Sequence, residues 1–154
     1  MSYAPLPFFV VYTLLTLALS WHDWRTGLLP DCLTCPLLWG GVLYHLCFYP
    51  ARLSLSLWGA IGGYIAFALI YWGYRGLRHR EGLGYGDVKL LAALGAWHGW
   101  QALPELILTA TLLALIFISL SALHLREWQA LKNPLPFGPF LAAAGFIIYG
   151  LGVT

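Results

Sequence analysis

Charged residues are scarce in this sequence, and their scarcity indicates the class of protein. Asp, Glu, Lys and Arg make up only 9% of the 154 residues, 60% are hydrophobic and the mean hydropathy is +0.76. An average soluble domain has about 25% charged residues, so this composition predicts an all-α integral membrane protein. The net charge of +2 is too small to indicate a nucleic-acid partner. Nearly the whole length is needed for membrane spans, so we expect one membrane-embedded domain over residues 1–154.

Cysteine and histidine are too few and too dispersed for the common metal sites. Cys32 and Cys35 form a CxxC, but a structural zinc takes four ligands, and the third cysteine, Cys47, supplies no second pair. Their i, i+3 spacing in an apolar stretch favours plain packing on a helix. The five histidines form no HExxH motif, and no Ser–His or Cys–His arrangement suggests a nucleophile. We therefore expect no metal and no other cofactor.

Six apolar stretches are long enough, or nearly long enough, to cross a membrane as helices. They cover about residues 5–21, 32–49, 54–74, 87–100 and 103–123, and a last stretch that ends near Gly152. The fourth stretch is short for a span. The first 20 residues have no basic region and no clear cleavage site, so we expect this segment to stay as a span. The sequence thus predicts about six transmembrane helices.

Lysines and arginines lie almost all on one side of these predicted spans. The first, third and fifth connections, with the adjoining helix ends, hold seven of the eight, and only Arg52 is on the opposite side. Because positive residues are concentrated in cytoplasmic loops, we predict three cytoplasmic connections and both termini outside.

Two aspartates are predicted at equal depth on that cytoplasmic side. Asp23 lies where the first apolar stretch ends, and Asp87 lies where the fourth begins. Two facing carboxylates cannot both ionise cheaply, so they share a proton. The ionised group can then take a proton from water while the other donates one, which is the chemistry of an aspartic protease. The alternative is that each aspartate only caps a helix, or pairs with Arg25 or Lys89.

A glycine-rich turn precedes the second aspartate. Gly84 and Gly86 can take a positive φ, or let another chain approach the backbone closely. Asp87 itself can act as an N-cap, where the helix dipole favours its ionised form. We expect Gly86 either to have a positive φ or to lie against a substrate strand.

Three segments in this order resemble the motifs of type IV prepilin peptidases. Residues 23–31 (DWRTGLLPD) resemble the first aspartate motif, residues 84–90 (GYGDVKL) resemble the GxGD motif, and residues 136–142 (PFGPFLA) are similar to a third signature. The resemblance implies that Asp23 and Asp87 are the catalytic pair. Supporting positions in the three motifs are Thr26, Pro30, Gly84, Gly86, Lys89, Pro136, Gly138 and Pro139.

The same resemblance implies a substrate and a location. Such enzymes remove a short basic leader from prepilins or pseudopilins, after a glycine, at the cytoplasmic face of the bacterial inner membrane. Full-length members carry an additional N-terminal region with two CxxC pairs and methylate the new N-terminus. Because the first aspartate here is only residue 23, we expect a short form without that region. The CxxC at Cys32 and Cys35 follows the first aspartate motif and cannot replace it.

Three other functions remain open at this point. A non-catalytic scaffold of a pilus or secretion assembly would not need both aspartates, and both are present. A small transporter or channel would place an acid near the middle of the bilayer, whereas Asp23 and Asp87 are predicted at helix ends. A presenilin-like intramembrane protease would share the GxGD motif, but it carries Pro-Ala-Leu where this chain has Pro-Phe-Gly-Pro-Phe.

Overall fold

The computed structural model describes residues 6–78, 84–125 and 135–151, and these residues form helices with no strand. The α-helices are α1 (Leu6–Thr26), α2 (Asp31–Phe48), α3 (Leu53–Arg78), α4 (Tyr85–His98), α5 (Leu103–Leu125) and α6 (Gly138–Gly150). Two short 3-10 segments, η1 (Pro50–Arg52) and η2 (Trp100–Ala102), precede α3 and α5. The all-α prediction is confirmed, and a helix lies at each of the six predicted positions.

Three of these helical segments are individually long and apolar enough to cross a membrane. They are Leu6–Thr26, Pro50–Leu77 and Trp100–Ala122, while α6 is a shorter apolar helix. Large apolar side chains such as Leu14, Leu69 and Leu112 are exposed along them. Exposed leucines in such number suit a lipid environment rather than water. The protein is therefore a multi-pass membrane protein.

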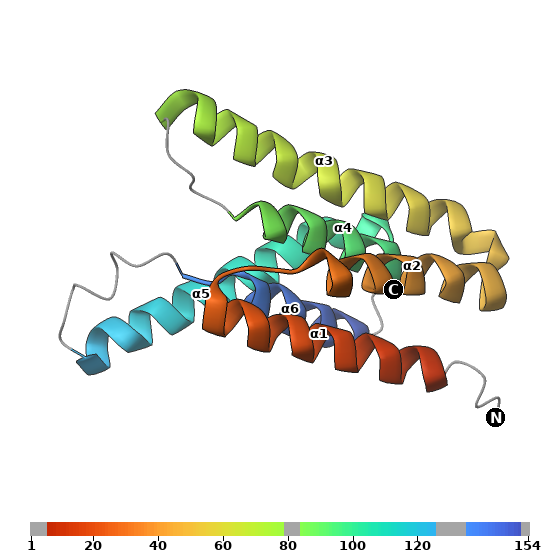
Figure 1. Ribbon diagram of the computed structural model, residues 1–154, viewed down its shortest axis with the longest axis horizontal. Coiled ribbons are helices and arrows are strands. Elements are labelled where there is room, and N and C mark those ends of the chain that lie inside the picture. The colour runs from red at the N-terminus through yellow and green to blue at the C-terminus, as the bar shows by residue number, and fades with distance from the viewer. Residues whose placement is uncertain (1–5, 79–83, 126–134, 152–154) are drawn as a thin grey trace.

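Helix α4 forms the centre of the bundle. Apart from its first two residues and Lys89, every residue of this 14-residue helix is buried. It packs against α3, α2 and α6 (Figure 1). At the α3 crossing the backbones of Gly59 and Gly95 touch, because neither residue has a side chain to hold them apart. A helix buried on all sides has no polar face, which explains why its sequence reads as an apolar run.

All helix ends that the sequence placed on one side lie at one end of the bundle. The C-terminal ends of α1, α3 and α5 and the N-terminal ends of α2, α4 and α6 are the left-hand ends of these helices in Figure 1. This matches the predicted alternation of the connections. Which side of the membrane this end faces stays a prediction. The charged residues Arg80, Glu81, Arg126, Glu127 and Lys132 lie outside the described residues.

Two expectations about the spans were inaccurate. Helix α1 continues past Trp21, where the first span was expected to end, to Thr26, and Asp23 lies in its last turn, at a helix end as expected. Cys32 and Cys35 were expected to pack on an apolar helix, but they are exposed on α2, as is Cys47, and all three cysteines are free. In a lipid environment an exposed cysteine is in apolar surroundings, so burial in the protein core is not required.

Candidate active site

The first aspartate is buried at the end of α1. Asp23 is only 4% exposed, and its Oδ2 accepts a hydrogen bond from the backbone N–H of Gly138, 2.9 Å away. The helix ends here because Gly27 takes a left-handed φ of +65°, and its N–H donates to the Asp23 carbonyl at 2.7 Å. A carboxylate at a helix C-terminus is unfavourable by itself. The N–H donated by Gly138, at the start of α6, offsets that cost.

The third motif supplies this donor by starting α6 against the first aspartate. The Phe137 carbonyl accepts from the N–H groups of Phe140 and Leu141, both at 3.1 Å, and Pro139 occupies the first turn, where its missing N–H costs nothing. A Cβ at Gly138 would lie 2.6 Å from Asp23 Oδ2. Any side chain there would collide with the carboxylate. Pro136, which precedes this turn, is half-buried.

The second aspartate is buried in the first turn of α4. Asp87 is 6% exposed, and its backbone N–H donates to the Gly84 carbonyl at 3.0 Å. Gly84 is the N-cap residue, so the expectation that Asp87 caps the helix was wrong. Asp87 still benefits from its place in the first turn, where the helix dipole favours a negative charge.

The glycines of this turn are needed for space and not for an unusual backbone. Gly84 has an extended conformation (φ −68°, ψ 135°), and Gly86 is within α4. Among the described glycines only Gly27 and Gly99 have a positive φ, so a positive φ at Gly86 was wrongly expected. A Cβ at Gly86 would lie 2.8 Å from the Cβ of Leu29, between α1 and α2. The close neighbour of Gly86 is thus another part of this chain.

These turns bring the two carboxyl groups together. Asp23 and Asp87 are close enough for the charge on one to act on the other. Their surroundings differ, because Asp23 accepts the Gly138 N–H whereas Asp87 Oδ1 has no hydrogen-bond partner among the described residues. Two adjacent carboxyl groups in unlike environments can divide the roles of acid and base.

The remaining motif residues shape the turns around the pair. Lys89 Nζ binds Asp31 Oδ1 at 2.6 Å and thereby ties α4 to the start of α2. The alternative that Lys89 neutralises one of the buried aspartates is therefore wrong. The Pro30 carbonyl, at the N-cap of α2, accepts the N–H groups of Leu33 and Thr34.

The α1–α2 connection also depends on a threonine. Thr26 Oγ1 donates to the His22 carbonyl at 2.8 Å and accepts the Leu28 N–H at 3.3 Å. Sequence reasoning missed the Asp31–Lys89 pair and the Gly138–Asp23 contact. Both join residues from different motifs, so the only signal available was that the motifs occur together.

The described residues contain no cluster of three or more potential metal ligands. The expected independence from metal stays a prediction.

Comparison with known proteins shows the family to which the chain belongs. Residues 10–119, which include both aspartates, match the type IV leader peptidase family. The chain belongs to this family. Its relatives include the leader peptidase HopD of Salmonella typhimurium, 59% identical over 94% of this chain and 93% of the relative. The HopD leader peptidase of Escherichia coli is 57% identical over the same shares.

A longer relative matches in part. The prepilin leader peptidase/N-methyltransferase of Dickeya chrysanthemi is 50% identical over 83% of this chain but only 44% of its own length. No solved structure matches the chain. The predicted membrane protease of the prepilin peptidase kind is confirmed. Membership of this peptidase family disfavours the transporter and the presenilin-like protease as alternatives.

Proposed function

We propose that this leader peptidase uses Asp23 and Asp87 to hydrolyse the leader peptide bond of type IV prepilins or pseudopilins. The observation that best supports this proposal is that two buried carboxyl groups from separate helices interact at one end of the bundle. The relatives named as prepilin leader peptidases support the substrate class. We propose further that residues 1–154 act as one domain in the bacterial inner membrane, in contact with lipid but not with nucleic acid, and cut at its cytoplasmic face.

In the proposed reaction the two aspartates have different roles. Asp23, which accepts the Gly138 N–H, carries the negative charge, and Asp87 carries the shared proton on the oxygen that has no described partner. A water molecule attacks the scissile carbonyl carbon while Asp23 takes its proton. Asp87 gives its proton to the carbonyl oxygen. The tetrahedral intermediate then collapses: the C–N bond breaks, the proton held by Asp23 passes to the leaving amine, and one hydroxyl proton of the intermediate returns to Asp87.

Amide substitutions of the two aspartates test this mechanism. Asp23→Asn and Asp87→Asn should each lower cleavage of a co-expressed prepilin by orders of magnitude. The reason is that the reaction needs both carboxyl groups, so the loss of either one removes the activity of the pair. Glu105→Gln is the matched control, since Glu105 is an exposed carboxylate in the first turn of α5, at the other end of the bundle. Leader removal is followed by the mobility shift of the prepilin, at equal levels of membrane-inserted enzyme. Near-normal cleavage by either aspartate variant would contradict the assignment.

A further inference from the structure

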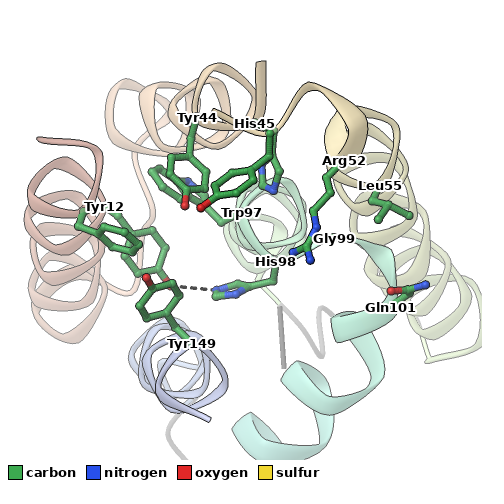
Figure 2. A pocket seen from close by; sticks show the side chains of 12 residues that line it. Tyr12, Tyr44, His45, Arg52, Leu55, Trp97, His98, Gly99, Gln101 and Tyr149 are labelled. Atoms are coloured by element: carbon green, nitrogen blue, oxygen red, sulfur yellow. Dashed lines mark hydrogen bonds between the residues drawn. The ribbon is translucent and has the colours of Figure 1, made fainter. Parts of the chain in front are cut away.

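A polar cavity lies at the end of the bundle opposite the aspartates. Its volume is about 680 Å³ (Figure 2). Along α1, Tyr12 precedes Asp23 by 11 residues, and along α4, His98 follows Asp87 by 11 residues. At 1.5 Å per residue, each helix separates the cavity from the aspartates by about 16 Å. The cavity is therefore distinct from the candidate active site.

A buried histidine in this cavity lacks a partner. His98 is 7% exposed, and its Nδ1 has no hydrogen bond within the part of the chain that the structure describes. Its other ring nitrogen, Nε2, is 3.3 Å from the Tyr12 hydroxyl. A buried phenol needs an acceptor, so we assign the tautomer in which Tyr12 donates to Nε2 and Nδ1 carries the proton. A buried N–H without an acceptor is unfavourable, and a bound group with an acceptor atom would remove that cost.

The structure makes room for this pair of side chains. A Cβ at Gly145 of α6 would lie 2.5 Å from the Tyr12 hydroxyl and 3.4 Å from His98 Nε2. Glycine at this position lets α6 pass close to both groups. The Tyr12–His98 contact is thus built into the packing of three helices, and Nδ1 is held in a fixed position.

The charges around the cavity favour an anion. Arg52 points into it toward His98 (Figure 2). None of the described residues that line the cavity is acidic. A guanidinium group and an imidazole N–H are donors suited to phosphate oxygens. A metal cation would meet the positive charge of Arg52 without a carboxylate to balance it.

A second histidine offers an acceptor. His45 is buried, and because a carbonyl only accepts, its Nδ1 must donate to the Gly41 carbonyl at 2.9 Å. The neutral ring then presents Nε2 as an acceptor, which suits a hydroxyl group. The cavity also has aromatic walls, where Tyr44 stacks on Trp97 with ring centroids 5.6 Å apart. Such walls suit carbon atoms, and the volume exceeds that of a lone phosphate ion.

We propose that this cavity binds a phosphoglycerol group, with its phosphate at Arg52 and His98 and a hydroxyl at His45. Two sources share this chemistry. One is the headgroup of an anionic glycerophospholipid, because such lipids surround any protein that crosses a bacterial membrane. The other is a soluble glycerol phosphate. The proposal does not depend on the roles of the two aspartates.

Lipid binding by the intact protein tests the proposal. The purified protein in detergent is titrated with phosphatidylglycerol, and bound lipid is counted by native mass spectrometry. Arg52→Gln should weaken binding by about tenfold or more, and His98→Gln should also weaken it. Arg25→Gln is the matched control, because Arg25 is an exposed arginine at the other end of the bundle. Thermal unfolding of each variant verifies that it is folded, and the exposed Arg52 is the variant of choice if His98→Gln unfolds.

Two further ligands identify the source. Diacylglycerol, which lacks the phosphate, should not compete with phosphatidylglycerol. Glycerol 1-phosphate is added alone, and its binding is detected as an increase in the unfolding temperature that Arg52→Gln abolishes. Saturable binding of the lipid or of the soluble ester, sensitive to Arg52, supports the site and names its source. Equal binding by the wild type and Arg52→Gln, equal binding of diacylglycerol, or no binding of either phosphate compound would overturn the proposal.

Discussion

Gly86→Ala changes the packing beside Asp87 without touching an ionisable group. The added Cβ would lie 2.8 Å from the Cβ of Leu29, and 3.1 and 3.3 Å from two further atoms of that side chain. Carbon atoms in favourable contact are about 3.5–4.0 Å apart. Because Cβ is the fixed root of the leucine side chain, a rotamer change cannot relieve the clash. The first turn of α4 and the α1–α2 connection must separate.

The required separation allows the effect on catalysis to be estimated. Relief of the contact needs a displacement of roughly 0.7 Å between the turn that carries Asp87 and the α1–α2 connection, which follows the last turn of α1 with Asp23. A misplacement of about 1 Å can cost about a hundredfold in rate. We therefore expect Gly86→Ala to lower kcat/KM for prepilin cleavage about tenfold, which corresponds to about 1.4 kcal/mol of barrier. Alanine is the better helix former by up to about 1 kcal/mol, so the yield of folded protein should change little.

Gly76→Ala is the matched control for this substitution. Gly76 is also a helical glycine, but a Cβ there would meet no atom within 4 Å. A second test is Leu29→Gly, which removes the opposing Cβ. The double variant Gly86→Ala/Leu29→Gly should be more active than expected from the two single variants, as a double-mutant cycle would show. Equal and mild effects of alanine at Gly86 and Gly76 would refute the packing argument.

Three other predictions concern the site, the bundle and its orientation. Gly138→Ala should lower cleavage at least as much as Gly86→Ala, because the added Cβ would lie 2.6 Å from Asp23 Oδ2. Gly150→Ala is the control and should not lower cleavage, because a Cβ at Gly150 has open space around it. The prepilin cleavage assay measures both variants. Gly59→Ala should reduce the thermal stability of the protein in detergent by several degrees, since its Cβ would collide with the Gly95 carbonyl, and unchanged unfolding would contradict the α3–α4 crossing. Cysteine labelling in intact cells should reach Arg52→Cys but not Arg78→Cys from outside, and the reverse pattern would invert the predicted orientation.

Much of the fold follows from the sequence because lipid imposes simple rules on it. Long apolar stretches with few charges must form helices, and the positions of α1, α3 and α5 were predicted within a few residues. Both aspartates were placed at one end by counting spans. The end of α1 was misjudged because His22, Asp23 and Arg25 were taken as the sign of a connection. The Gly138 N–H satisfies the Asp23 carboxylate within the helix, which therefore continues through these polar residues until the turn at Gly27 ends it.

Contacts between distant motifs could not be predicted in the same way. Asp23 and Gly138 are 115 residues apart, and Asp31 and Lys89 are 58 apart, so no local periodicity connects them. The positive φ that was one of two expectations for Gly86 was wrong for a related reason. A glycine in a turn suggests a positive φ, but the same residue is equally needed where a neighbour leaves no room for a Cβ. Only the position of Leu29 distinguishes these two explanations.

The short central helix explains how a small bundle positions both of its polar sites. Helix α4 is buried along its length, and it carries Asp87 in its first turn and His98 in its last. Helix α1 carries Asp23 near its end and carries Tyr12 at a distance of 11 residues before Asp23. The two helices therefore pair polar side chains at two levels of the bundle, Asp23 with Asp87 and Tyr12 with His98. Helix α6 contacts both pairs through a glycine, Gly138 at one level and Gly145 at the other. A shift of α6 along its axis would therefore disturb both levels together, so an alanine at Gly145, whose Cβ would lie 2.5 Å from the Tyr12 hydroxyl, should lower the stability of the protein and also disturb the aspartate pair.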